Sequence, residues 1–287
     1  MSFGSSVVFI DAFATVPLES RLCWDDNRFD DVTIHADQPI DTECNRPEVK
    51  YDMRINIKES RWRRREFLEL GATTTAMAAT VDDAKAVAAS GVDAVVAQGG
   101  EAGGHRSTWV KRESRDQANI GGMALIPQIV DAVRVPVIAA GGITDGRGIA
   151  AALALGASGA LIGTRFIATR ESGAPDFYKQ ALLKADSDAT TVTDKFTGMY
   201  ARVLRNAFTE EYESSGAPAF PPFFQFLAMG AIIKAATERG SGEYFPMYAG
   251  QGVGSLRDLP RAADVVHSLV REAQAVITCL LQRARSI

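Results

Sequence analysis

The stretch PVIAAGGITDGRGIAAALALGASGALIGT, residues 136–164, decides the fold class. It runs from an apolar segment through a glycine pair into an alanine-rich segment, and then into a second apolar segment. Continuous apolar strands separated by amphipathic helices are typical of a parallel sheet covered on its faces. The pattern predicts a strand at 135–142, a helix at 145–156 and a strand at 158–164.

The same alternation extends toward the N-terminus. It predicts strands at 72–77 and 92–98, and helices at 81–91 and 124–133. Units of about 30–45 residues, with glycines at the C-terminal ends of strands, favour a (β/α) barrel over a doubly wound sheet. No strand–helix junction here carries the GxGxxG of a Rossmann turn. We therefore expect an α/β chain with a TIM-barrel-like (β/α) fold.

The first 67 residues do not continue this alternation of strands and helices. Strand-like pieces occur at 7–10, 31–36 and 49–57, with no good helix between them. Four earlier βα units of about 30 residues each would need roughly 120 residues. Either the barrel is incomplete at its N-terminus, or this segment does something else. Open parallel edges invite pairing, so closure by a partner chain in a homo-oligomer is one expectation.

The pattern becomes helical after residue 171, and a proline-rich joint lies at 217–222. We expect a helical lid beside the barrel. The chain then divides into an atypical N-terminal segment (1–67), the C-terminal part of a barrel with a phosphate site (68–170), and a helical lid with a closing segment (171–287). The predicted helices of the last part are 175–185, 200–212, 223–240 and 260–287.

The composition is that of an ordinary globular protein. Of the 287 residues, 46% are hydrophobic and 23% are charged, and the formal net charge of −4 favours neither nucleic acid nor an anionic membrane as a partner. Cys23, Cys44 and Cys279 form no CxxC pair, which indicates a reducing, cytoplasmic compartment and no zinc site. No apolar run reaches the roughly 18–20 residues that a membrane span needs.

Residues 63–68 and the following stretch GATTTAMAA (71–79) together have the look of a twin-arginine export signal. The arginines lie far from the N-terminus, and Glu69 and several threonines interrupt the apolar part. We interpret the segment as a basic surface helix that ends at Gly71, followed by a strand.

Glycines follow two predicted neighbouring strands. Gly141 and Gly142 follow the strand at 135–140, and Gly163 and Thr164 follow the strand at 158–162. Glycine lets backbone N–H groups approach a ligand closely, and a helix that starts near Asp145 would add unpaired N–H groups. For one loop alone, a tight βα turn explains the glycines. Two such loops at adjacent strand ends favour phosphate binding.

The loop in VVAQGGEAGGHRSTW, residues 95–109, opens at the same end of the sheet. Its glycines would let the chain pass close to a flat cofactor and project His105 inward, where an imidazole with an ordinary pKa of about 6.5 can accept a proton. A surface histidine in a mobile loop is the alternative. Glu101 is either a second acid/base group or an exposed charge, while His35 and His267 lack such a setting. No Ser–His–Asp order or metal-ligand cluster is visible.

Five segments together resemble the nitronate monooxygenase family. The resemblance covers about residues 68–287. Residues 1–67 match no part of the family, and they lack the Ala-Pro-Met flavin loop with which the family normally opens. The segments are QGGEAGGH (98–105), PVIAAGGITDGRGIAAALALGA (136–157), GALIGTRFIATRES (159–172), ARVLRNAF (201–208) and YAGQGVG (248–254).

The resemblance implies an FMN-bearing TIM barrel with a helical lid, which oxidises alkyl nitronates with O₂ to a carbonyl compound and nitrite. It implies that His105 is the active-site histidine, facing the nitro group and able to act as a base toward a neutral nitroalkane. The implied FMN contacts are Gly141, Gly142, Gly163 and Thr164 at the phosphate, Gln98 and Gly99 at the ribityl chain or ring, and Gly250 and Gln251 from the C-terminal segment.

Two other functions remain open. The GGH, AAGGI and GTRF segments also resemble the FMN-dependent enoyl-acyl-carrier-protein reductases, which use NAD(P)H. The acidic residues Glu210, Glu211 and Glu213 disfavour docking of an acidic carrier protein. The third possibility is a catalytically inactive, truncated relative.

Overall fold

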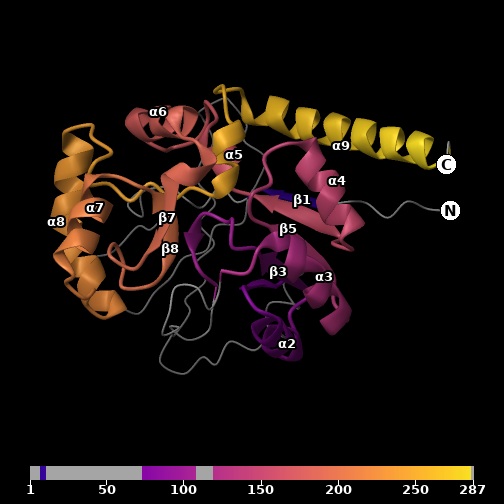
Figure 1. Ribbon diagram of the computed structural model, residues 1–287, viewed down its shortest axis with the longest axis horizontal. Helices are drawn as coiled ribbons and strands as arrows, with labels where there is room; N and C mark the ends of the chain where they lie inside the picture. Colours follow the sequence, from indigo (N-terminus) through magenta and orange to yellow (C-terminus); the bar gives the residue numbers. More distant parts are fainter. Residues whose placement is uncertain (1–6, 11–72, 108–118, 286–287) are drawn as a thin grey trace, which may run out of the picture.

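A parallel sheet of five strands forms the centre of the computed structural model, which describes residues 7–10, 73–107 and 119–285 (Figure 1). The strand order is β1-β6-β5-β3-β2. Every residue of β3 and β5 is buried, as expected for strands covered on both faces. The α/β class and the parallel sheet are confirmed. The strands are β1 (Val7–Ile10), β2 (Thr75–Ala78), β3 (Ala94–Gln98), β5 (Val137–Ala140) and β6 (Gly159–Ile162).

The position of β1 bears on closure of the barrel. β1 pairs with β6, the last strand of the parallel sheet in chain order. In a closed (β/α) barrel the first strand also lies beside the last. The strand predicted at 7–10 is confirmed, and β1 and β2 are the two edges of the described sheet. The predictions for residues 31–36, 49–57 and 63–71, and for Cys23, Cys44 and His35, lie outside the described residues.

Three helices cover one face of the sheet: α2 (Val81–Ala89), α3 (Gly122–Ala132) and α4 (Gly146–Ala154). Leu125 and Ile129 of α3 pack with Val95 and Val137 of the sheet in the main hydrophobic core. The helices predicted at 81–91, 124–133 and 145–156 are confirmed within a few residues at each end.

The register brings the ends of three strands to one edge of the sheet. Gln98 pairs with Ala140, and Ala140 pairs with Leu161. The N–H of Gly99 donates to the carbonyl of Ala140 at 2.8 Å. The loops after β3, β5 and β6 therefore open side by side, as the glycine pattern predicted.

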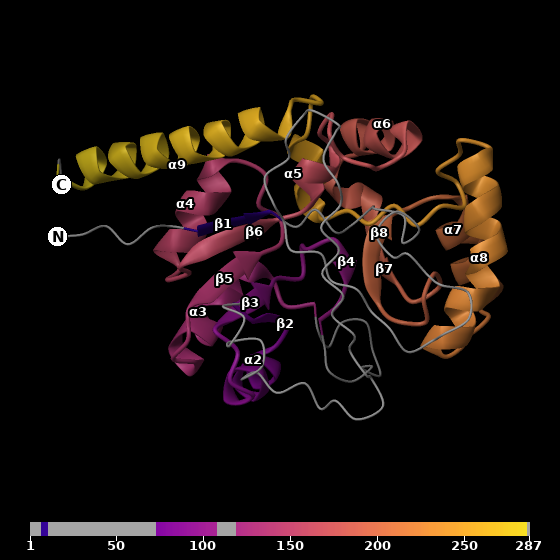
Figure 2. The same cartoon turned by 180° about the vertical axis from the view of Figure 1, so that it is seen from behind.

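Residues 171–255, here called the lobe, contain strands as well as helices. β7 (Thr190–Thr193) and β8 (Ala201–Leu204) form an antiparallel sheet with β4 (Gly104–His105), in the order β4-β8-β7. The lobe helices are α6 (Asp176–Lys184), α7 (Ala207–Ser215) and α8 (Pro222–Glu238). In Figures 1 and 2, α7 and α8 lie at the end of the molecule opposite the C-terminus.

The helix predicted at 200–212 is wrong for its first part. All four residues of β8 are buried, and α7 begins only after Asn206, whose side chain caps it. The apolar spacing of this segment also suits a helix. Pairing with β4 and β7, which come from other parts of the sequence, selects the strand.

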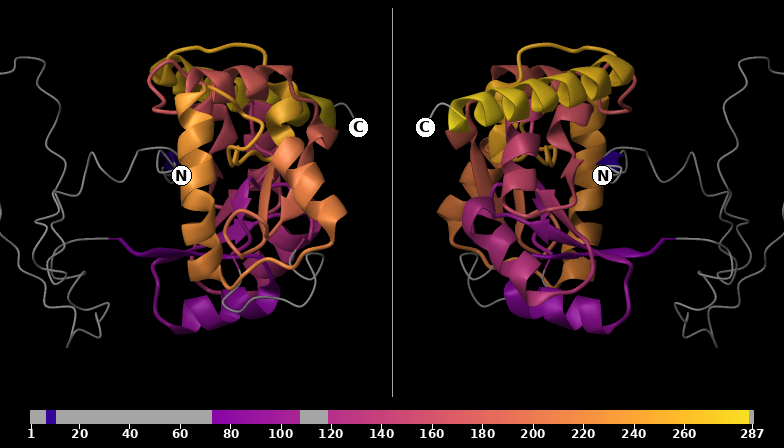
Figure 3. Two further views of the ribbon diagram at one scale, coloured as in Figure 1. Left: turned by 90° about the vertical axis from the view of Figure 1, so that its left-hand side faces the viewer. Right: turned by 90° about the vertical axis from the view of Figure 1, so that its right-hand side faces the viewer.

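The last helix, α9 (Ala262–Ala284), does not cap the lobe. Its residues Val265, Leu269 and Ala273 pack with Ile149 of α4 and Ile162 of β6. Figures 2 and 3 show α9 lying across α4. The closing segment of the chain thus covers the parallel sheet rather than completing a helical lid.

The contact between α4 and α9 leaves no room for a side chain at Gly146. A Cβ there would lie 2.3 Å from the backbone nitrogen of Ala273 and 2.3 Å from Cβ of Glu272. We predict that Gly146→Ala lowers the free energy of unfolding, measured in urea, by about 1–3 kcal/mol. The control is Gly230→Ala in α8, where a Cβ meets nothing within 4 Å. It should raise stability by about 0.5–1 kcal/mol. Equal stability of the two variants would contradict this packing.

Candidate active site

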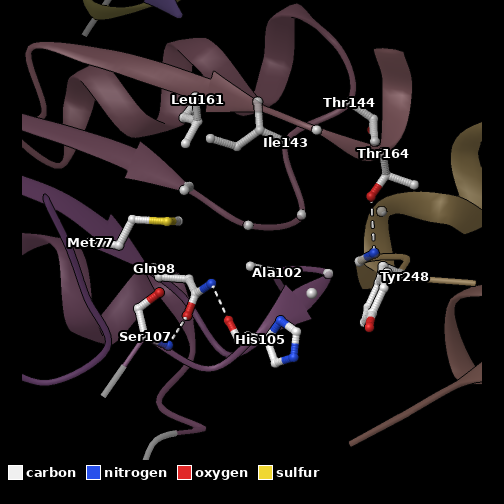
Figure 4. A pocket seen from close by; sticks show the side chains of 18 of the residues that line it. Met77, Gln98, Ala102, His105, Ser107, Ile143, Thr144, Leu161, Thr164 and Tyr248 are labelled. Carbon is white, nitrogen blue, oxygen red and sulfur yellow. Dashed lines mark hydrogen bonds between the residues drawn. The ribbon is translucent and has the colours of Figure 1, made fainter. Parts of the chain in front are cut away.

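A cavity of about 410 Å³ opens where β3, β5 and β6 end (Figure 4). Its volume lies within the range of roughly 300–1,000 Å³ that is typical of small-molecule sites. In Figure 4, His105 and Tyr248 lie on one side, and Ile143 and Leu161 lie on the other. Seven of the site residues predicted from the sequence line it: Gln98, His105, Gly141, Gly142, Gly163, Thr164 and Gly250.

The lining is almost free of charge. Of the described residues, no aspartate, glutamate, lysine or arginine lines the cavity, and the ionisable groups there are His105 and Tyr248. An anion in this cavity would meet no repelling carboxylate. It would depend for its hydrogen bonds on backbone N–H groups, on these two side chains and on the hydroxyl groups of Ser107, Thr144 and Thr164.

The glycines at the ends of β5 and β6 are required for different reasons, backbone conformation after β5 and open space after β6. Gly141 and Gly142 have positive φ angles of +111° and +70°, a conformation that disfavours other residues. Gly163 has an ordinary φ of −101°, but a Cβ there would meet nothing within 4 Å. Because Gly163 lines the cavity, the missing side chain leaves space in which a ligand can approach the backbone.

The N–H groups at the start of α4, near Asp145, were expected to attract a phosphate. They already donate hydrogen bonds to carboxylates of the protein. The Asp145 side chain accepts hydrogen bonds from the N–H groups of Arg147 and Gly148, and Glu272 of α9 accepts from that of Gly146 at 3.0 Å. These N–H groups are therefore capped by carboxylates. The short helix α5 (Thr164–Ile167) differs, because no side chain caps it at Gly163.

The glycine loop after β3 is held by two buried arginines. Arg106 donates to the carbonyl oxygens of Gly99 at 3.0 Å and of Ala102 at 2.5 Å. Arg202 of β8 donates to the carbonyl of Gly100 at 2.9 Å. Hydrogen bonds from a charged donor are stronger than neutral ones. The loop therefore has a defined path, in contrast to the mobile loop considered from the sequence.

Glu101 caps a helix. Both of its carboxylate oxygens accept from the N–H of Gly122 at 2.9 Å, at the start of α3. It does not line the cavity. Glu101 is therefore neither an acid/base group in the cavity nor a free surface charge, which are the two roles considered from the sequence.

Gln98 fixes the backbone on both sides of Arg106. Its amide nitrogen donates to the carbonyl of His105 at 2.8 Å, and its amide oxygen accepts from the N–H of Ser107 at 2.8 Å (Figure 4). The side chain of Gln98 is buried, and β4 is also paired with β8. His105 therefore enters the cavity from a backbone that is held on several sides.

The electrostatic setting of the cavity keeps its ionisable groups neutral. Loss of solvation, and then repulsion by Arg106, lowers the pKa of His105 from the usual 6.5. Its ring remains exposed to the open cavity, so a bound ligand would desolvate it further. Burial raises the pKa of Tyr248 to about 12. At neutral pH the imidazole is a proton acceptor, and the phenol is a donor.

Tyr248 comes from the lobe and lies near the imidazole. Its ring centroid is 5.5 Å from that of His105, and its carbonyl accepts a hydrogen bond from the hydroxyl of Tyr178. The N–H of Gly250, two residues later, donates to the Thr164 hydroxyl at 3.0 Å. The sequence motif 248–254 pointed to this segment, but not to Tyr248 itself.

Two predicted contact residues do not line the cavity. A Cβ on Gly99 would meet Glu101 and the backbone of Gly122, so Gly99 faces the start of α3. Gln251 begins the 3₁₀ helix η4 (Gln251–Ser255), and its N–H donates to the carbonyl of Glu101. His267 is exposed on α9, as expected for a helix-face residue. Within residues 73–107 and 119–285, no cluster of His, Cys, Asp and Glu could hold a metal ion, and no helix could span a membrane.

Comparison with known sequences identifies the family of this chain. The model of the nitronate monooxygenase family matches residues 59–272. A probable nitronate monooxygenase of Staphylococcus haemolyticus is 42% identical over 215 residues, which are 72% of this chain and 57% of the relative. One from Bacillus subtilis is 38% identical over 208 residues, 72% of this chain and 59% of the relative. The chain thus spans less than two thirds of the length of these relatives.

Solved structures agree with this relationship. The nitroalkane oxidase from Streptomyces ansochromogenes is 41% identical with a TM-score of 0.70, over 75% of this chain and 61% of the oxidase. FabK from Thermotoga maritima is 31% identical with a TM-score of 0.65, over 77% of this chain and 67% of FabK. These likenesses confirm the TIM-barrel-like fold class. Because the family model covers most of the chain and the motifs meet in one cavity, the chain belongs to the nitronate monooxygenase family.

Proposed function

We propose that the cavity binds FMN, and that the chain oxidises alkyl nitronates and nitroalkanes with O₂ to a carbonyl compound and nitrite. One observation carries the proposal: a cavity edged by glycines, at the ends of β5 and β6, has among its described lining residues one imidazole and no aspartate, glutamate, lysine or arginine. The family supports the same reaction. The small-molecule partners are then a nitronate and O₂.

The residues present suit a flavin. The open space beside Gly163, which a Cβ would fill, suits a phosphate that is bound by the backbone at Gly142, Gly163 and Thr164. Met77 and Leu161 offer apolar contact to a flat ring. Bound there, FMN would supply the acceptor for the substrate's electrons and the group that O₂ reoxidises.

The side chains of the cavity have distinct tasks in this reaction. A nitronate is already a carbanion equivalent, so the cavity has only to admit it and orient it. A neutral nitroalkane must first lose a proton from the carbon that bears the nitro group, and the neutral His105 accepts it. Tyr248, which stays protonated, donates a hydrogen bond to a nitro oxygen on which negative charge develops.

The decisive experiment separates this function from its two rivals. The purified full chain is examined for a flavin spectrum and then mixed without oxygen with propionate 3-nitronate. Bleaching of the flavin band, followed by nitrite release when O₂ is added, supports the proposal. Consumption of NADH with an enoyl thioester, without nitrite formation, would identify a reductase. Absence of flavin even after incubation with FMN would identify an inactive relative.

The phosphate position generates a prediction. Gly163→Val should lower the flavin content per chain by about tenfold or more, because the new side chain fills the space beside the backbone. Thermal unfolding of the flavin-free protein should change little, since the φ of −101° suits any residue. Gly230→Val, at an open position of α8, is the control and should retain flavin. Full flavin content in Gly163→Val would rule out this phosphate position.

The role of His105 predicts a difference between two substrates. His105→Gln should lower kcat/KM for neutral nitroethane by roughly 10²–10⁴-fold, the usual contribution of a general base, and affect preformed ethyl nitronate much less. In the unmodified chain, nitroethane oxidation should fall as the pH drops through the lowered pKa of His105, because protonated imidazole is not a base. His267→Gln, on the exposed face of α9, is the control. Equal losses on both substrates would argue against His105 as the base.

A further inference from the structure

The base function of His105 depends on which ring nitrogen is free. Nε2 lies 2.8 Å from the hydroxyl oxygen of Thr197. Among the residues that the structure describes, Nδ1 has no hydrogen-bond partner. In Figure 4 the ring nitrogen next to the attachment carbon is turned toward the cavity. Only the neutral tautomer with its proton on Nε2 leaves a lone pair on Nδ1 there.

The hydrogen bonds of Thr197 favour this tautomer. Its hydroxyl donates to the carbonyl of Met199 at 3.2 Å and accepts from the N–H of Met199 at 3.4 Å. A hydroxyl has one proton, and a carbonyl can only accept. With that proton directed to Met199, a lone pair of the Thr197 hydroxyl faces Nε2 of His105 at 2.8 Å and can accept from Nε2–H.

The neighbours of Thr197 hold it in place. Phe196, which precedes it, is buried in a cluster with Phe208 and Met229. Gly198, which follows it, has a φ of +78°, and a Cβ there would lie 2.6 Å from the carbonyl oxygen of Phe220. The side chain of a threonine is also stiff about its first torsion. The Thr197 hydroxyl therefore has a fixed position and can orient the imidazole of His105.

We propose that Thr197 is a positioning residue that places the proton of His105 on Nε2, so that Nδ1 is the atom that accepts the substrate proton. The proposal deepens the proposed function and rests on it. The C–H bond of the nitroalkane breaks and its electron pair forms the C=N bond of the nitronate, while the π pair of the N=O bond moves onto that oxygen. The proton moves to Nδ1, and the resulting imidazolium is stabilised by its hydrogen bond to Thr197.

The tautomer can be measured independently of any activity. The chain has three histidines, and long-range ¹H–¹⁵N correlation spectra distinguish a protonated from an unprotonated ring nitrogen. His105→Gln and His267→Gln assign the signals. We expect the neutral imidazole of His105 in the purified full chain to carry its proton on Nε2. A proton on Nδ1 would overturn the proposal.

Kinetics of Thr197 variants provide the second test. Thr197→Val keeps the shape but removes the hydroxyl, and kcat/KM for nitroethane should fall by roughly 10–100-fold, part of the usual contribution of a general base. Flavin content and turnover of the preformed nitronate should change little, and Thr197→Ser should restore nitroethane oxidation. Unchanged nitroethane oxidation in Thr197→Val, or no rescue by serine, would overturn the proposal. If the unmodified chain oxidises no nitronate, the proposed function fails, whereas the tautomer measurement still stands.

Discussion

Two buried guanidinium groups hold the glycine loop, and the geometry of the site depends on them. Arg106 and Arg202 bind the carbonyl oxygens of Gly99, Gly100 and Ala102. A glycine-rich segment loses much conformational freedom on ordering, and charge-assisted hydrogen bonds offset that loss. Because the arginines come from the end of the loop and from β8, they also join the parallel sheet to the lobe. His105 therefore has a fixed position between the parallel sheet and the lobe.

Much of the sheet and part of the site could be predicted from the sequence, because the signals are local. The apolar runs at 92–98, 135–142 and 158–164 became β3, β5 and β6, since a strand buried on both faces needs continuous apolar residues. Parallel strands end at a common edge, so Gly142, Gly163 and His105 could be expected to lie together, and all three line one cavity.

The rest depends on contacts between distant parts of the chain. The 201–204 segment is a strand only because β4 and β7 pair with it. Gly99 belongs to a motif whose glycines look alike in sequence, yet it faces the start of α3 rather than the cavity. Thr197 and Tyr248 reach His105 through the folding of the lobe, and no spacing along the chain predicts those approaches.

Glu272 closes the start of α4 beside the cavity, although it belongs to the last helix of the chain. An uncapped helix start at that place would compete with the glycines at the ends of β5 and β6 for a phosphate or an anionic substrate, and it would hold the anion away from the imidazole. In the proposed function, the Glu272 carboxylate would therefore remove a competing anion site, although α9 does not line the cavity. A residue of α9 would thus influence where an anion binds in the cavity.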